Sequence, residues 1–144
     1  MSESTGWFYW AALSAVFAAL TAIFAKIGLE GVDSDLATLV RTLIIVVVLG
    51  AFVWLTGKWT NPLTLSSRTL TFLALSALAT GASWVCYFRA LKLGDASQVA
   101  PVDKFSLVLV AVFAFIFLGE RPGAREWFGI ALVACGVLVL AIKR

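Results

Sequence analysis

Residues 97–106 carry an acid, a base and a proline into an otherwise apolar run. Asp103 and Lys104 each cost about 2.5–3.5 kcal/mol to place inside a bilayer on insertion scales, so charges at such positions tend to serve a function. We expect Lys104 to bind an anionic group and Asp103 to carry a proton, if the chain moves one. Pro101 has no N–H and, inside a helix, frees a carbonyl that can bind a ligand. Ser106 completes this polar cluster.

A second embedded cation, Arg41, lies in an earlier apolar run at a depth similar to that of Asp103. Two interpretations are open. Arg41 and Asp103 form an ion pair that joins two helices, or Arg41, Asp103 and Lys104 surround a polar substrate and exchange partners as a cavity opens. Because consecutive helix residues project about 100° apart, we expect Asp103 and Lys104 to point in different directions.

A hydroxyl, an indole and a phenol recur at helical spacing in the third apolar run, at Thr80, Trp84 and Tyr87. Tyr87 stands near the end of the run, where tyrosine and tryptophan are enriched at the membrane surface. Thr80 and Trp84 lie deeper, either as the wall of a cavity or as lipid-facing or core residues. Ala77 and Gly81 are expected on a separate face, where they permit close helix packing.

Five apolar stretches must position these side chains. They run over residues 7–27, 36–55, 70–91, 99–118 and 127–142, and each is close to the roughly 17–25 residues that cross a bilayer as a helix. Hydrophobic residues make up 62% of the sequence and charged residues 13%, against about 45–50% and about 25% in soluble domains. The longest connection is too short for a soluble module. We predict an all-α membrane protein with five transmembrane helices, in a single domain over residues 1–144.

Several classes of chemistry are disfavoured by the composition. Histidine is absent, which argues against a transition-metal site and against a Ser-His-Asp triad. Cys86 and Cys135 fall inside predicted spans, where we expect buried small hydrophobes. The pI of about 9.1 needs no nucleic acid, because Lys and Arg gather at helix ends in membrane proteins. We predict no catalytic residue, no metal, no cofactor and no enzyme activity.

The positive charges are almost balanced across the five predicted helices. An odd number of crossings puts the two termini on opposite sides, here called side A for the N-terminus and side B for the C-terminus. Leaving out the two embedded cations, side A holds four (Lys58, Arg68, Arg121, Arg125) and side B five (Lys26, Arg89, Lys92, Lys143, Arg144). Orientation follows the Lys/Arg excess. The balance leaves open both a single orientation with side B cytoplasmic and a dual topology.

Small residues form a stripe on the first predicted helix at Ala11, Ala15, Ala18, Ala22 and Ala25. Their alternating spacing of four and three residues places them on one side, where two backbones can approach closely. We expect this stripe to contact another helix, either of the same chain or of a second subunit.

Several short motifs follow one another in a fixed order along nearly the whole chain. They are Arg41, Tyr87-Phe88-Arg89-Ala90-Leu91 followed by Asp95-Ala96-Ser97, Pro101, and Leu118-Gly119-Glu120-Arg121 followed by Gly129 and Gly136. This pattern resembles the EamA-type five-helix unit of the drug/metabolite transporter superfamily. The resemblance carries over Arg41, Pro101 and Glu120, the last as a capping, interface or transport residue.

The resemblance implies an architecture and a mechanism. Typical members join two such units in inverted orientation into ten helices, so this chain is one half of that architecture. Two copies are then expected to pair as an antiparallel, dual-topology homodimer that works by alternating access. The chain departs from the four-helix multidrug exporters of the superfamily, which use an acidic residue in the first helix. Proton-coupled export of hydrophobic cations by that route is therefore not expected.

Three functions compete. The leading hypothesis is a secondary transporter that exports a small polar metabolite, amino-acid-like or similar, across the lipid of a bacterial inner membrane. The second is a lipid-linked sugar flippase or its accessory subunit, which predicts an obligate partner chain. The third is a non-transporting partner that stabilises another membrane protein. The candidate substrate-binding or gating residues are Arg41, Thr80, Trp84, Tyr87, Pro101, Asp103, Lys104 and Ser106.

Overall fold

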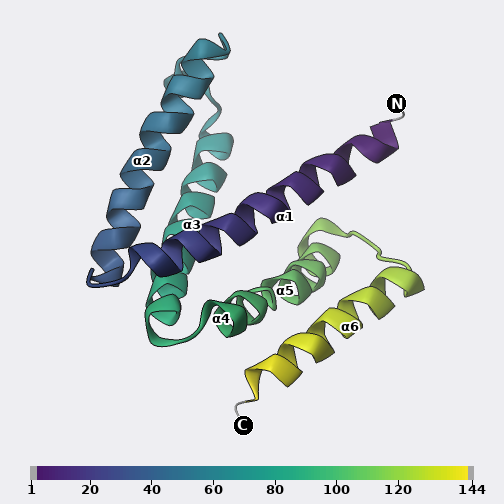
Figure 1. Ribbon diagram of the computed structural model, residues 1–144. Helices are drawn as coiled ribbons and strands as arrows, with labels where there is room; N and C mark the ends of the chain where they lie inside the picture. The colour runs from purple at the N-terminus through teal and green to yellow at the C-terminus, as the bar shows by residue number, and fades with distance from the viewer. Residues whose placement is uncertain (1–2, 143–144) are drawn as a thin grey trace. The chain divides into compact units, whose positions relative to one another are not determined.

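Helices and short connections make up the described part of the chain, residues 3–142 of a computed structural model, and no strand occurs among them (Figure 1). The α-helices are α1 (Glu3–Gly28), α2 (Ser34–Leu55), α3 (Ser67–Leu93), α4 (Ala96–Asp103), α5 (Ser106–Phe113) and α6 (Ala124–Ala141). A 3-10 turn, η1 (Pro62–Thr64), lies in the connection between α2 and α3, and a π-helical turn, η2 (Ala114–Leu118), continues α5.

Five segments of this fold are long and apolar enough to cross a membrane, which confirms the predicted all-α membrane architecture. They are Gly6–Gly28, Ser34–Leu55, Ser67–Leu93, Ala96–Leu118 and Ala124–Ala141. The last four begin two or three residues before the predicted starts. The reason is that each first turn is polar or mixed and therefore invisible to hydropathy. At α2 this turn is capped by the Asp33 carboxylate, which accepts the N–H groups of Asp35 at 2.9 Å and Leu36 at 3.1 Å.

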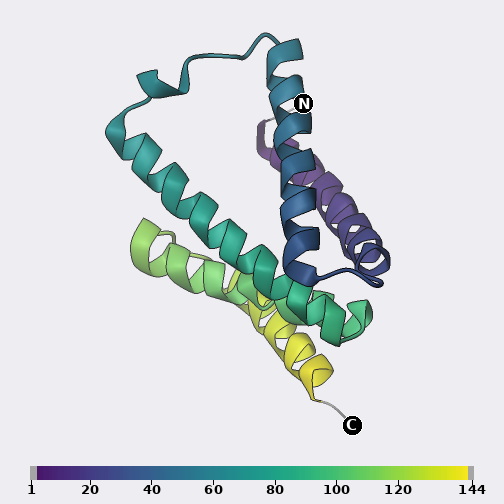
Figure 2. The same ribbon diagram turned by 90° about the vertical axis from the view of Figure 1, so that its left-hand side faces the viewer.

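The chain divides into two compact units, one of residues 24–93 and one of residues 1–23 with 94–144. In the first unit, α2 packs along α3. The two helices are closest at the end where α2 begins and α3 ends, and they diverge toward the connection that holds η1 (Figure 2). Leu91, which is fully buried, and Phe88 form the core of that corner. The Lys26 ammonium donates to the Leu91 carbonyl at 2.7 Å, and the Lys92 ammonium donates to the Val32 carbonyl.

In the second unit, α4 and α5 pack against α6, with Ala114 and Val137 buried. The predicted fourth span is one membrane-crossing segment that consists of α4, α5 and η2. It is interrupted between Asp103, where α4 ends, and Ser106, where α5 begins. Around this interruption the hydrogen bonds shorten from a four-residue to a three-residue spacing. The N–H groups of Phe105, Leu107 and Val108 donate to carbonyls three residues earlier, each at 3.0 Å. Such tightened turns inside a long helix often mark a hinge.

Most apolar side chains of the chain are exposed, as expected of a protein whose outer surface meets lipid. The small-residue stripe of α1 follows this pattern. Ala22 is buried and Ala25 half-buried, whereas Ala11, Ala15 and Ala18 are exposed. The partner of the stripe, a helix of the same chain or of a second subunit, stays a prediction.

Candidate functional site

The guanidinium of Arg41 lies on two aromatic rings of α3. Its central carbon is 4.4 Å from the centroid of the Trp84 ring and 5.4 Å from that of Phe88. Trp84 and Phe88 are one helical turn apart, so their rings present one continuous face to α2. A guanidinium over an aromatic ring is stabilised by about 0.5–1 kcal/mol when exposed and about 2 when desolvated.

This arrangement leaves the N–H edges of Arg41 available. Among the described residues of its own unit, 24–93, no carboxylate forms an ion pair with it. The aromatic face therefore holds the cation in an apolar span without neutralising it. A guanidinium offers five donors in a planar fork that matches a carboxylate or phosphate. The geometry suits recognition of an anionic group.

A groove of about 630 Å³ runs between α2 and α3 beside Trp84. Its polar lining consists of Asp35 and the hydroxyls of Thr38, Thr42, Ser76 and Thr80, and its apolar lining of Leu39, Ile45, Val46, Leu73, Ala77, Gly81, Trp84 and Val85. The hydroxyls of Thr38, Thr42 and Thr80 each donate to the carbonyl four residues earlier, at 2.7–2.8 Å. Their oxygens still have lone pairs to accept with. The groove thus offers acceptors to a ligand within an apolar wall.

Two sequence predictions about α3 change with this geometry. Thr80 and Trp84 line the groove, as the cavity interpretation expected. Ala77 and Gly81 line the same groove, so the prediction of a separate face is wrong: the two sets are adjacent strips of one broad surface, and the small residues make room for the groove. Tyr87 is half-buried beside Phe88, at 6.4 Å between ring centroids, and is not part of the groove lining.

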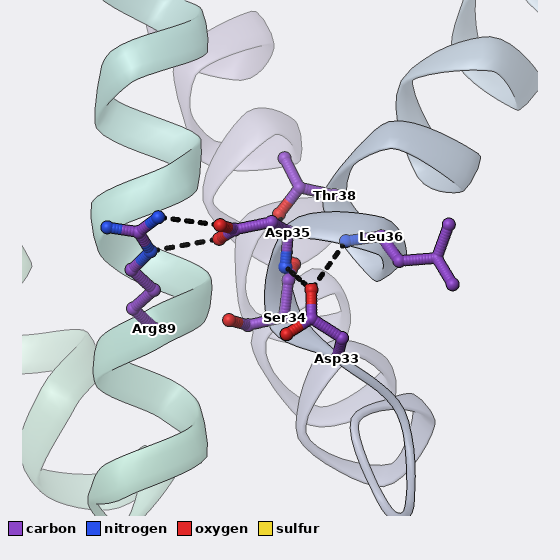
Figure 3. A network of polar contacts seen from close by, with 6 residues as sticks. All are labelled: Asp33, Ser34, Asp35, Leu36, Thr38 and Arg89. Carbon is purple, nitrogen blue, oxygen red and sulfur yellow. Dashed lines mark hydrogen bonds and ion pairs between the residues drawn. The ribbon is translucent and has the colours of Figure 1, made fainter.

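An ion pair that the sequence analysis missed stands beside the groove. The Arg89 Nε donates to Asp35 Oδ1 at 2.9 Å and its Nη2 to Asp35 Oδ2 at 2.6 Å (Figure 3). This two-bond geometry ties the start of α2 to the end of α3. A signal exists in the sequence, since both residues fall on side B at the ends of predicted spans, but it is weaker than that of the more deeply embedded charges.

Reversing the charge of Arg89 tests this tie. Arg89→Asp is expected to lower the melting temperature in detergent, because two carboxylates then face each other, and the double change Asp35→Arg with Arg89→Asp should recover most of the loss. Arg68→Asp, at the other end of α3, is the matched charge reversal and should have little effect. Equal losses in Arg89→Asp and Arg68→Asp would show that the pair contributes nothing.

The polar cluster of the fourth span lies in the other unit. Pro101 is inside α4, and Ser106 begins α5. The Lys104 ammonium is 3.3 Å from Asp103 Oδ2, so the expectation that these neighbours point in different directions is wrong. The lysine stem is long enough for its ammonium to reach the carboxylate of the preceding residue. The two residues form a weak, half-exposed pair.

The eight predicted site residues therefore fall into two groups. Arg41, Thr80, Trp84 and Tyr87 belong to the α2–α3 unit, and Pro101, Asp103, Lys104 and Ser106 to the other. The Arg41–Asp103 ion pair, for which each unit supplies one residue, stays a prediction.

The thiols and acidic groups of the described residues do not gather into a metal site. Cys86 and Cys135 are free thiols exposed on the surface of the chain, so their predicted burial is wrong. Within the described residues, no three Cys, Asp or Glu side chains come together in a way that could hold a metal ion.

Comparison with known proteins agrees with the five-span fold. The model of the EamA-like transporter family matches residues 5–142. A Sinorhizobium protein described as an uncharacterized transporter in the cobO 3′ region is 56% identical over 142 residues, covering 99% of both chains.

Shorter matches are to a protein described as a probable 4-amino-4-deoxy-L-arabinose-phosphoundecaprenol flippase subunit, ArnE. The Yersinia pestis and Yersinia pseudotuberculosis proteins are each 32% identical over 73 residues, or 51% of this chain and 64% of the relative. No solved structure matches the chain significantly. With its family model spanning five membrane-crossing helices, the chain belongs to the EamA-like transporter family.

Proposed function

We propose that this transporter exports a small polar metabolite that carries a carboxylate and an amine, an amino acid or a close analogue. It works by alternating access in the bacterial inner membrane, as an antiparallel homodimer in which residues 1–144 of each copy form one transport domain. Five helices are half of the ten-helix architecture of the wider superfamily, and near-balanced positive charges suit insertion in both orientations.

The observation that carries the proposal is the Arg41 guanidinium, held on Trp84 and Phe88 within a membrane-crossing helix. In this role the fork of Arg41 takes the substrate carboxylate through two charge-assisted hydrogen bonds. The hydroxyl oxygens of Thr38, Thr42 and Thr80 along the adjoining groove accept from its amine. A substrate that carries both a carboxylate and an amine binds to Arg41 and to the groove hydroxyls together.

The fourth span supplies the moving part in this proposal. In this role Lys104 exchanges its contact with Asp103 for one with an anionic group, and Asp103 then carries the coupling proton. The interruption at Lys104 and Phe105 lets α4 and α5 tilt separately, and Pro101 and Ser106 on its two sides line the path. This exchange requires a weak Asp103–Lys104 ion pair, because a strong pair would keep Lys104 from releasing Asp103.

Reconstitution into proteoliposomes tests the function. Vesicles containing the purified protein are loaded with radiolabelled amino acids, the matching amines without a carboxylate and the matching acids without an amine. Efflux of the amino acids that clearly exceeds efflux of both single-group analogues is the expected result. Equal efflux of all three would refute the two-point recognition, and absence of any efflux would favour the role of a non-transporting assembly partner.

A flippase subunit is the second candidate, favoured by the similarity to the Yersinia flippase subunits and by the largely apolar wall of the α2–α3 groove. It predicts that the chain acts on a lipid-linked sugar together with a different partner chain. The same vesicles, prepared with a fluorescent lipid-linked sugar, distinguish the two candidate functions. The fraction of the label that is accessible from outside the vesicles rises with time if the protein is a flippase and stays constant if it is a metabolite exporter.

A further inference from the structure

A second groove, of about 480 Å³, lies between α6 and the segment formed by α5 and η2. Its apolar wall is Leu107, Val110, Ala111 and Ala114 from α5 and η2 with Ile130 from α6, and its mouth is formed by Glu120, Arg121, Pro122 and Glu126. None of these residues takes part in the proposed substrate site. Leu107 and Val110 are 53% and 63% exposed, so the unit that holds the groove leaves this wall uncovered.

The lining of the groove suits a position at the boundary between membrane and water. Its apolar wall belongs to the membrane-crossing segments Ala96–Leu118 and Ala124–Ala141, and its mouth lies mainly in the connection between them. Trp127, whose ring contacts Phe115 at 6.3 Å between centroids, marks the same level, since tryptophan gathers at the membrane surface. A ligand that fills the groove therefore has an apolar tail at membrane depth and a polar head at the surface.

The local backbone holds the mouth in place. The π-helical turn η2 is followed by Gly119, which has a φ of +68°, and the Glu120 N–H donates back to the Ala114 carbonyl at 3.2 Å. Residues other than glycine rarely adopt a positive φ. The Glu126 Oε2 accepts the Gly123 N–H at 2.6 Å, which fixes its carboxylate at the start of α6. Among the described residues, no ion pair forms between Arg121 and either glutamate.

We infer that this groove binds a resident phospholipid with an ethanolamine head group. The mouth carries two carboxylates and one guanidinium, which complements a head group with one ammonium and one phosphate. The primary ammonium donates three hydrogen bonds to Glu120 and Glu126, and Arg121 binds the phosphate. A choline head has no N–H donor, and a glycerol head has no cation. The acyl chain covers the exposed wall of Leu107 and Val110.

Lipid retention measured by native mass spectrometry tests the inference on the whole protein. The purified protein is offered equal amounts of phosphatidylethanolamine, phosphatidylcholine and phosphatidylglycerol in detergent. Retention of ethanolamine lipid over glycerol lipid by about tenfold is expected, because two charge-assisted contacts are available to one and not to the other. Glu120→Gln with Glu126→Gln should remove the preference, while the amide oxygen introduced by Glu126→Gln still accepts from the Gly123 N–H and keeps the helix start.

Glu30→Gln with Asp95→Asn removes two exposed carboxylates outside the groove and should leave the preference unchanged. Equal retention of the three lipids by the unmodified protein would overturn the inference, as would an unchanged preference in the Glu120→Gln, Glu126→Gln variant. A cysteine at Val110 that cross-links two copies, with no lipid retained, would show that a second chain covers the wall instead.

Discussion

If the proposed substrate class is right, replacing Arg41 with Gln is expected to slow amino-acid efflux roughly 10- to 150-fold at low substrate concentration. A hydrogen bond to a charged group contributes about 1.5–3 kcal/mol, and each 1.4 kcal/mol is a factor of ten. Arg41→Lys should give an intermediate rate, because it keeps the charge and loses the planar fork. Initial rates of efflux from proteoliposomes measure both.

Controls separate binding from folding in this series. Arg68→Gln with Lys143→Gln removes one cation from each side, which preserves the charge balance, and should transport normally. Lys104→Met tests the second embedded cation and should lower transport while two copies still associate. Full efflux in Arg41→Gln would remove Arg41 from the site. If Asp103→Asn loses activity and the added change Arg41→Gln restores it, the two residues form a structural ion pair instead, since removing both charges relieves the unpaired one.

Forcing all copies into one orientation is expected to abolish transport completely. Lysines at Ser2, Ser4 and Thr5 raise the count on side A from four to seven against five on side B, which directs side A to the cytoplasm. An antiparallel pair cannot then form. Cell-based transport, with a reporter fused to the C-terminus to read its side, measures activity and orientation together.

Restoration by a complementary variant makes this test specific. Lys58→Gln with Arg68→Gln lowers side A to two cations against five on side B and directs side B to the cytoplasm. Each variant alone should be inactive, and the two expressed together should transport. Normal activity of either variant alone would show that antiparallel pairing is unnecessary, and the homodimer proposal would fail while the five-span fold would stand.

The sequence predicted the spans because hydropathy acts over about twenty residues at once, and five such segments are present. It did not predict where the fourth span breaks. Pro101 was the visible irregularity, yet it stays inside α4, where its missing N–H removes at most one bond. The interruption comes three residues later, at Lys104 and Phe105, through a change in hydrogen-bond spacing that no single residue type announces.

The candidate site was predictable in its residue types and less so in its contacts. Arg41, Thr80 and Trp84 were identified because polar and aromatic groups are conspicuous in an apolar span. The aromatic platform under Arg41 required knowing that Trp84 and Phe88 face α2, which depends on how the two helices pack. The same holds for Asp35 and Arg89, which lie 54 positions apart in the sequence.

The interrupted fourth span has an energetic consequence for a dimer of identical, oppositely inserted copies. Each copy brings one break, and a two-fold axis in the membrane plane exchanges them. If a tilt of α4 against α5 in one copy opens the substrate path to one membrane surface, the same tilt in the other copy opens it to the opposite surface. The forms open to the two surfaces have equal free energy in the absence of a gradient. A homodimer of the proposed kind therefore has no built-in direction, and the gradients of its substrate and of any coupling ion decide the direction of net transport.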